Sequence, residues 1–339
     1  MVWFPKIRGL ALKQQPHIGV ELGETGIKIA QVRKNGEAFE LAHAETIPVP
    51  KGVIDNDTIS DPGTVVRLLN KAVEGSGLPR RVVTAVTGTN VFIRHLLLPA
   101  MSPKEMAEAI KYEVESLIPF PLGEITYDYT KLADVNKDGM GKEEILLVAA
   151  RSASVNQLAE IMQEAGLEAV AIDVEPLALI RCALMLGSTY SGNMPLADTF
   201  AMVNIGRTNT LFAVVQEKII RFTRIIPFGS DHITGAVSGA AGPGVDTLAA
   251  GEMLTEIRRS LNFFRAQQHL DVTRLCLTGD GALLEGITRY FRENLNIETI
   301  DFNPFKMMDL GPSLQKSDMF KSGTAMAVAM GLALKEVNC

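Results

Sequence analysis

The strongest constraint on this chain is a strand-turn-strand pattern that occurs once in each half. Apolar residues alternate through 18–32 around a glycine-containing turn at 24–26, which is typical of a β-hairpin. The same arrangement recurs through 200–215 around a polar turn at 207–209, and both copies place an acid or an amide two residues before a glycine. A hairpin repeated once per half predicts a duplicated architecture. Because 339 residues exceed what one core usually supports, we expect two α/β lobes.

A smaller α/β unit is predicted inside the first half, over roughly 85–168. Ser102 followed by Pro103 and Glu105 is typical of a helix start, because serine caps the helix and proline suits its first turn. A loop containing Gly, Ser and Pro at 187–198 separates the two halves. The predicted strands lie at 81–86, 91–98, 125–133, 144–150 and 170–173, and the predicted helices at 60–75, 103–117, 152–164 and 176–186.

In the second half, residues 235–251 are mostly small, so we expect a loop or a frayed helix there. The segment 252–267 has apolar residues at steps of three and four, which predicts a strong helix. A strand at 274–278, a turn at 279–281, a helix from Ala282 and a packed terminal helix over 323–334 are expected to follow.

Composition excludes several classes of function. The net charge of −6 offers no basic surface that could release counterions from a nucleic acid, so we expect no nucleic-acid partner. The three cysteines are far apart and in no C-x-x-C spacing, which indicates buried thiols in a reducing compartment. No apolar run approaches the roughly 20 residues that a membrane-spanning helix needs. The tail at 1–16 carries Trp3 and Phe4 beside cationic residues, so it is either a membrane-proximal segment or a frayed end.

Three short turns are candidates for holding a nucleotide. Backbone N–H groups in glycine-bearing turns can approach phosphate oxygens because no Cβ blocks them, and two facing turns can clamp a phosphate chain between lobes. The turns at 23–26, 206–209 and 279–281 have this composition. One such turn alone is most often only a hairpin. Three in this order, each after a strand, predict a phosphate site.

Residues 19–28 and 203–210 resemble the two phosphate loops of the actin, Hsp70 and FtsA superfamily, and residues 277–282 resemble its adenosine-binding turn. Within that superfamily the chain resembles the PilM family of type IV pilus assembly proteins. The motifs that carry this second resemblance cover nearly the whole chain and lie at 98–101, 113–120, 127–129, 173–176, 256–264 and 331–334.

The resemblance implies a two-lobed actin-like fold with duplicated ribonuclease H-like α/β cores and an inserted α/β subdomain of the kind shared by FtsA and PilM. The first lobe would comprise residues 17–84, 169–196 and 322–339, with the inserted subdomain at 85–168. The second lobe would span 197–321 and contain a shortened small subdomain at about 230–270. The tail at 1–16 would lie outside both lobes.

The resemblance also implies sites for ATP and Mg²⁺. Glu21 and Asn204 would face the metal ion through water, and Glu175 either orients a water molecule or is simply an acid favoured at a helix N-terminus. For Glu256 and Arg259 a structural salt bridge is the alternative to a nucleotide contact. The expected nucleotide contacts are Gly23, Glu24, Thr25, Gly26, Lys28, Gly206, Arg207, Thr208, Asn209, Glu256, Arg259, Gly279, Asp280 and Gly281.

The chain departs from the superfamily pattern in three places. Glu21 replaces the usual aspartate of the first loop, which keeps the charge but reaches one methylene further. Asn204 replaces a second aspartate, and an amide neither accepts a proton nor brings negative charge to a metal ion, so hydrolysis is disfavoured. A glycine- and alanine-rich stretch ending at Gly251 replaces the family's Ala-Glu-x-x-Lys helix, so one adenosine contact is expected to be missing or remodelled.

By this resemblance we expect a cytoplasmic scaffold, peripheral to the inner membrane, that meets the membrane surface indirectly. It would bind the cytoplasmic N-terminal peptide of PilN in an apolar groove beside the inserted subdomain, and would communicate with the pilus assembly ATPase and platform proteins. Homo-oligomerisation stays open. Alternatives with the same fold are an active ATPase, a nucleotide-dependent filament-forming protein, and a sugar or acetate kinase, whose substrate motifs are not visible. The expected groove residues, each with core packing as the alternative, are Leu96, Leu97, Leu98, Met101 and Ile110.

Overall fold

The computed structural model describes residues 16–35, 38–137, 140–189, 199–234, 247–311, 314 and 318–335. Its α-helices and β-strands are, in chain order, β1 (Ile18–Leu22), β2 (Gly26–Asn35), β3 (Ala38–Pro48), β4 (Ile54–Asp55), β5 (Thr58–Ile59), α1 (Pro62–Val73), β6 (Arg81–Val86), β7 (Val91–Pro99), α2 (Pro103–Leu117), β8 (Ile125–Lys137), β9 (Met140–Arg151), α3 (Ser152–Glu164), β10 (Glu168–Val174), α4 (Glu175–Thr189), β11 (Phe200–Ile205), β12 (Thr210–Gln216), β13 (Ile219–Ile226), α5 (Ser230–Thr234), α6 (Thr247–Gln268), β14 (Arg274–Thr278), α7 (Ile287–Leu295), β15 (Glu298–Asp301), β16 (Asp309–Leu310) and α8 (Ala327–Ala333).

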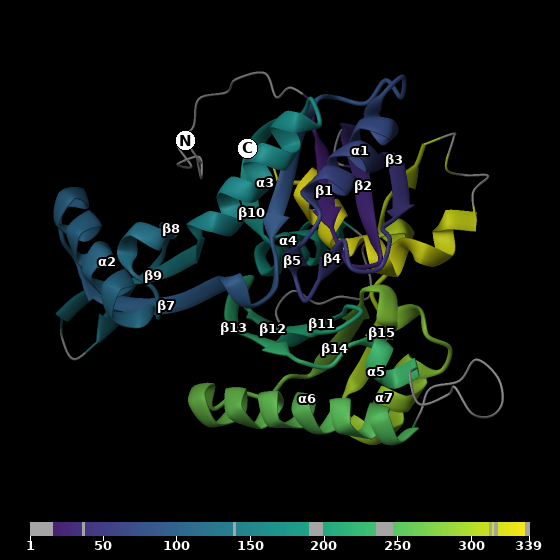
Figure 1. Cartoon of the computed structure of the whole chain (residues 1–339). Helices are drawn as coiled ribbons and strands as arrows, with labels where there is room; N and C mark the ends of the chain where they lie inside the picture. The colour runs from purple at the N-terminus through teal and green to yellow at the C-terminus, as the bar shows by residue number, and fades with distance from the viewer. Residues whose placement is uncertain are drawn as a thin grey trace.

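Two sheets share one strand order, which confirms the predicted duplication (Figure 1). The six-stranded sheet runs β10-β6-β1-β2-β3-β16 and the five-stranded sheet runs β13-β12-β11-β14-β15. In each sheet the first hairpin strand, β1 or β11, pairs antiparallel with the second hairpin strand and parallel with β6 or β14. When both sheets are followed from the edge that holds the parallel strands, β10-β6-β1-β2-β3 of the first sheet corresponds to β15-β14-β11-β12-β13 of the second.

The sheets and helices stack in layers because the strands are apolar on both faces. In β11, Ala201 and Val203 face the core that α6 and α7 cover, whereas Phe200 and Met202 face a central core shared with α4 and α8. The six-stranded sheet also contributes one face to that central core, and its other face packs against α1 and α3. The pair α4 and α8 thus lies between the two sheets. No helix among the described residues is long and apolar enough to cross a bilayer.

The central helices approach each other and β1 at glycine. A Cβ on Gly331 of α8 would lie 1.8 Å from the carbonyl oxygen of Ala178 in α4. A Cβ on Gly19 of β1 would lie 2.2 Å from the carbonyl oxygen of Ala329. Close backbone packing of this kind needs glycine, because any side chain would fill the contact. The two lobes are therefore joined through a tightly packed centre.

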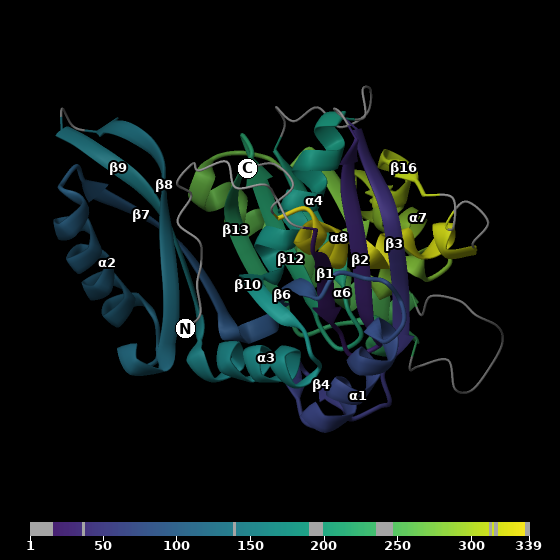
Figure 2. The ribbon, with the colours of Figure 1, turned by 90° about the horizontal axis from the view of Figure 1, so that it is seen from above.

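A third sheet, β7-β9-β8, projects from the lobes together with α2 (Figures 1 and 2). The predicted capping box of α2 is present, with Glu105 N–H donating to Ser102 Oγ and the Glu105 side chain bonded to the Ser102 backbone. Buried residues of α2 and one sheet face form a separate small core. On the other face His95 bonds the Ile220 carbonyl at 2.5 Å, which ties this projecting unit to β13 of the second sheet.

Two elements lie with a different unit from the one that their predicted range suggests. Helix α3 falls within 85–168, but its apolar residues pack in the core of the six-stranded sheet with β1, β6 and α1. Strand β16 falls within 197–321, but it pairs parallel with β3 at the edge of the six-stranded sheet. The projecting unit is therefore built from β7, α2, β8 and β9.

Some predicted boundaries are wrong. The helix expected from Ala282 begins only at Ile287, because residues 280–283 form a 3-10 turn and Gly286 then takes a left-handed conformation with φ of 86°. Helix α6 begins at Thr247, earlier than the predicted Glu252. In the terminal segment only Ala327–Ala333 is α-helical, and a 3-10 helix precedes it. The N-terminal tail, most of the loop at 187–198 and the glycine- and alanine-rich residues 235–246 lie outside the described residues.

Candidate functional site at the junction of three turns

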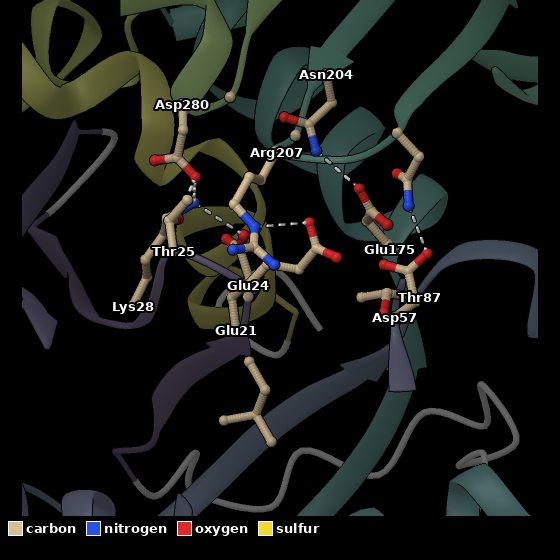
Figure 3. A pocket seen from close by; sticks show the side chains of 15 residues that line it. Glu21, Glu24, Thr25, Lys28, Asp57, Thr87, Glu175, Asn204, Arg207 and Asp280 are labelled. Carbon is tan, nitrogen blue, oxygen red and sulfur yellow. Dashed lines mark hydrogen bonds and ion pairs between the residues drawn. The ribbon is translucent and has the colours of Figure 1, made fainter. Parts of the chain in front are cut away.

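The three predicted turns meet at one cavity of about 50 Å³ between the lobes (Figure 3). Gly23 and Gly206, the glycines of the two hairpins, both line it, so the two copies of the repeat face each other as expected. Polar and charged side chains dominate its walls. The lining residues are Glu21, Leu22, Gly23, Glu24, Thr25, Lys28, Asp57, Thr87, Glu175, Asn204, Gly206, Arg207, Asn209, Gly279 and Asp280.

Glycine is required where the third turn approaches the second. Gly279 follows β14 with φ of 88°, a conformation that residues with side chains rarely adopt. A Cβ there would lie 2.5 Å from both Asn204 Oδ1 and the Ile205 carbonyl oxygen. At Gly281 a Cβ would lie 2.2 Å from the Ile205 side chain. These two glycines let the third turn lie directly against the end of β11.

Glu24 of the first turn holds the second turn. The Thr208 N–H donates to Glu24 Oε2 at 3.0 Å, and the Thr208 hydroxyl lies 2.8 and 2.9 Å from the two carboxylate oxygens. The Asn56 N–H donates to Glu24 Oε1 at 2.6 Å, and Arg207 Nε lies 3.5 Å from Oε2. Only 8% of the Glu24 side chain is exposed. The carboxylate therefore occupies donors from both lobes.

The β4-β5 hairpin supplies two further acids that sequence reasoning did not identify. Asp55 accepts from Arg207 Nη2 at 3.0 Å, and Asp57 accepts from Asn209 Nδ2 at 2.7 Å. Asn56 and Asp57 form the tip with φ of 46° and 59°, as a two-residue hairpin of primed type requires. Asparagine and aspartate tolerate this conformation well. The pair Asn56-Asp57 is therefore a sequence signal for the turn, but it does not predict that the neighbouring acids bond residues of the second lobe.

A buried cation joins the first turn to the third. Lys28 Nζ lies 3.1 Å from Glu21 Oε1 and 3.1 Å from Asp280 Oδ2, and its side chain is 3% exposed. The Thr25 hydroxyl also donates to Asp280, at 2.6 Å. Burial alone would lower the pKa of Lys28, but the two carboxylates outweigh burial and raise it. Burial raises the pKa of Glu21, and the positive charge of Lys28 offsets only part of this rise.

Glu175 and Asn204 face each other at the start of α4. Asn204 Nδ2 donates to Glu175 Oε1 at 2.7 Å. Burial, followed by the negative charges of Asp57 and Glu21, raises the pKa of Glu175 to about 8. Burial likewise raises the pKa of Asp57. At neutral pH Glu175 is therefore largely protonated, which is not the form that would take a proton from water.

Comparison with known proteins decides the family. The family model described as "Type IV pilus assembly protein PilM" matches residues 19–246 and 249–337. The chain belongs to the PilM family of type IV pilus assembly proteins. A solved PilM-PilN type IV pilus biogenesis complex matches this PilM-family chain with a TM-score of 0.80 and 25% identity, covering 95% of this chain and 99% of that one. The match confirms that this chain has a two-lobed fold of the PilM type.

More distant likenesses were also found. The ethanolamine utilization protein EutJ from Carboxydothermus hydrogenoformans matches with a TM-score of 0.49 and 15% identity, covering 95% of this chain and 90% of that one. MreB 5 of Spiroplasma citri bound to AMPPNP matches with a TM-score of 0.49 and 13% identity, covering 96% of this chain and 97% of that one.

In this PilM-family chain most of the predicted nucleotide residues surround the cavity, but five do not line it. Glu256 instead accepts from Arg224 Nη2 at 2.8 Å and also pairs with Arg259, so both residues have the structural role that was the alternative. Gly26 pairs with Pro48 in the first sheet and Gly281 packs on Ile205. Thr208, outside the lining, contacts it through Glu24.

The five predicted groove residues separate into core and surface. Ile110 is fully buried and Leu96 is 8% exposed in the core between α2 and its sheet, so both have the core packing that was the alternative. Leu98 and Met101 are partly buried against the same core. Leu97, between Leu96 and Leu98 on β7, is 37% exposed. Period-two alternation along β7 explains why neighbouring leucines differ.

The cavity in this closed arrangement does not fit Mg²⁺ or a nucleotide. An ammonium group lies between Glu21 and Asp280, where a divalent cation would need those carboxylates. Four acids besides the largely protonated Glu175, and two cations, line the cavity, and this excess of acids opposes binding of a polyphosphate. A volume of about 50 Å³ holds a few water molecules. Nucleotide binding would require the lobes to separate at the turns.

Replacing Glu175 with glutamine is expected to change the pH dependence of stability. Because its folded pKa is about 8 and its unfolded pKa near 4.5, the folded state keeps a proton that the unfolded state loses between these pH values. The free energy of unfolding of the wild type should fall across this window, by up to about 1.4 kcal/mol per pH unit from this group.

Glu175→Gln lacks that contribution, so its stability should change less with pH. Urea unfolding of both proteins from about pH 5 to about pH 8 measures the difference. Glu21 and Asp57 remain in both proteins, so the difference between the profiles reports the Glu175 carboxyl together with its charge interactions with these two acids. Parallel stability profiles would contradict the prediction.

Proposed function

We propose that this chain is a cytoplasmic scaffold of the type IV pilus inner-membrane platform, whose main activity is to bind the cytoplasmic N-terminal peptide of PilN. The observation that carries the proposal is the match to a PilM-PilN complex over 95% of this chain and 99% of that one. Through PilN the scaffold is held peripherally at the inner membrane. The pilus assembly ATPase and other platform proteins are its further proposed partners.

The site favours binding over turnover. Asn204 brings no negative charge, and its Nδ2 group donates a hydrogen bond to Glu175. Glu175 has a pKa of about 8, so its side chain is largely protonated at neutral pH. A general base has to be unprotonated at the working pH and to have an open path to the water it activates. ATP is therefore proposed as a ligand of an opened site and not as a substrate.

Titration of a synthetic PilN N-terminal peptide into the full-length chain tests the main proposal. Binding in the micromolar range or tighter is the expected result, because an extended peptide gains backbone hydrogen bonds and a few apolar contacts. No heat change at high micromolar peptide would overturn the proposed function.

Leu97→Asp is expected to weaken this peptide by at least about tenfold, because a charge replaces an exposed apolar contact on the projecting unit. Leu248→Asp is the matched control, since Leu248 is 76% exposed at the start of α6 on the second lobe. Calorimetry of both variants measures the difference. Equal affinity of the two variants would show that the groove does not include Leu97.

A further inference from the structure

The second turn already has an anion bound to it, and that anion belongs to the chain itself. The Thr208 N–H and hydroxyl both bond the Glu24 carboxylate, at 2.8 to 3.0 Å. A carboxylate and a phosphate group present similar oxygen acceptors to such donors. We propose that Glu24 is an internal ligand that competes with phosphate groups for the second turn. This inference deepens the proposed nucleotide site and rests on it.

The geometry leaves no room for both anions. Glu24 uses both carboxylate oxygens on Thr208, and Oε1 also accepts from the Asn56 N–H at 2.6 Å. Only 8% of the Glu24 side chain is exposed, so the carboxylate lies largely buried against the partly exposed turn. A phosphate oxygen can reach the Thr208 N–H only after Glu24 has moved away. Binding of phosphate and binding of Glu24 are therefore mutually exclusive.

Competition at this turn couples the ligand to the contact between lobes. Glu24 belongs to the first turn and Thr208 to the second, so each phosphate that binds removes hydrogen bonds between them. The bonds from Arg207 to Asp55 and from Asn209 to Asp57 flank the same position and hold the lobes while Glu24 moves. Phosphate binding would therefore replace the bonds between Glu24 and Thr208 and weaken the contact between the two turns, while the flanking bonds remain.

The test compares Mg-ATP and inorganic phosphate binding to the wild type and to Glu24→Ala by isothermal titration calorimetry. The variant is expected to bind Mg-ATP at least about tenfold more tightly, because the charge-assisted bonds of the competing carboxylate are gone. Inorganic phosphate should gain in the same direction. Glu24→Gln, which keeps the side-chain shape, should show a smaller gain and serves if the alanine variant does not fold.

Asp231→Asn is the matched control. Asp231 carries the same charge and lies 3.9 Å from Arg207 Nε, but it is 54% exposed and does not bond Thr208. The affinity of Asp231→Asn for Mg-ATP and for inorganic phosphate should stay within about threefold of the wild-type value. Unchanged or weaker binding by Glu24→Ala, an equal gain in Asp231→Asn, or no binding by any of the proteins at millimolar ligand would overturn the proposal. The PilN peptide titration is read separately, so failure of one proposal does not imply failure of the other.

Discussion

Gly331→Ala is expected to destabilise the whole molecule, by at least about 3 kcal/mol. The new Cβ would lie 1.8 Å from the Ala178 carbonyl oxygen, which is backbone and cannot rotate away. Helices α4 and α8 would have to separate, and they form the layer between the two sheets. The Gly331 carbonyl also accepts from Arg181 Nη1 at 2.9 Å, so that bond would be strained as well. Thermal and urea unfolding measure the loss.

Gly123→Ala is the control for adding a methyl group at glycine. A Cβ at Gly123 would meet no atom within 4 Å, so stability should change little. A soluble Gly331→Ala protein with the melting temperature of the wild type would show that the close approach of α4 and α8 is wrong. A fall of roughly 5 to 10 °C or failure to fold is the expected result.

The repeat and the capped helix were predictable because their signals are local. Alternating apolar residues around glycine turns predicted the hairpins at 18–32 and 200–215, and the strands β1-β2 and β11-β12 lie there. Ser102 and Glu105 predicted the start of α2, and the capping box is present. Short-range hydrogen bonds and backbone preferences decide these elements, so three or four residues suffice to indicate each one.

Elements that depend on tertiary pairing were not predicted. Strand β3 mixes acids, histidine and alanine through 38–48 and is held by its long pairing with β2. Ala282, Leu283 and Leu284 suggested a helix, but the backbone at Gly281 packs against Ile205 and the segment stays a 3-10 turn. Leu96 and Ile110 were predicted to line a peptide groove, yet both are buried in the core between β7 and α2. Apolar residues alone do not reveal which face they cover.

The sequence predicted which turns form the candidate site, but it did not predict the hydrogen bonds that join these turns across the two lobes. The turns named from sequence do meet, because a duplicated fold brings equivalent hairpins together. Nothing local indicates that Glu24 bonds Thr208, since 184 residues separate them. Asp57 is likewise 152 residues from Asn209. Contacts at such separations follow from the packing of whole lobes, which single-sequence patterns do not carry.

Lys28→Met is the second large effect, with an expected loss of about 3 to 5 kcal/mol. The ammonium group lies 3.1 Å from both Glu21 and Asp280, and removing it leaves the Glu21 carboxylate buried without a counter-charge. Within the part of the chain that the structure describes, the second oxygen of Glu21 has no hydrogen-bond partner, so the carboxylate depends mainly on Lys28. The bond between Lys28 and Asp280 also joins the lobes. Urea unfolding near neutral pH measures the loss.

Two further variants show whether burial is the cause. Lys131 bonds the two carboxylates of Asp134 and Glu143 at 2.7 Å but is 42% exposed, so Lys131→Met should change stability little. Adding Glu21→Leu to Lys28→Met removes the unpaired buried charge, and an apolar pair of similar size should recover at least half of the loss. Equal losses at Lys28 and Lys131, or no recovery in the double variant, would mean that the buried carboxylate is not what Lys28 stabilises.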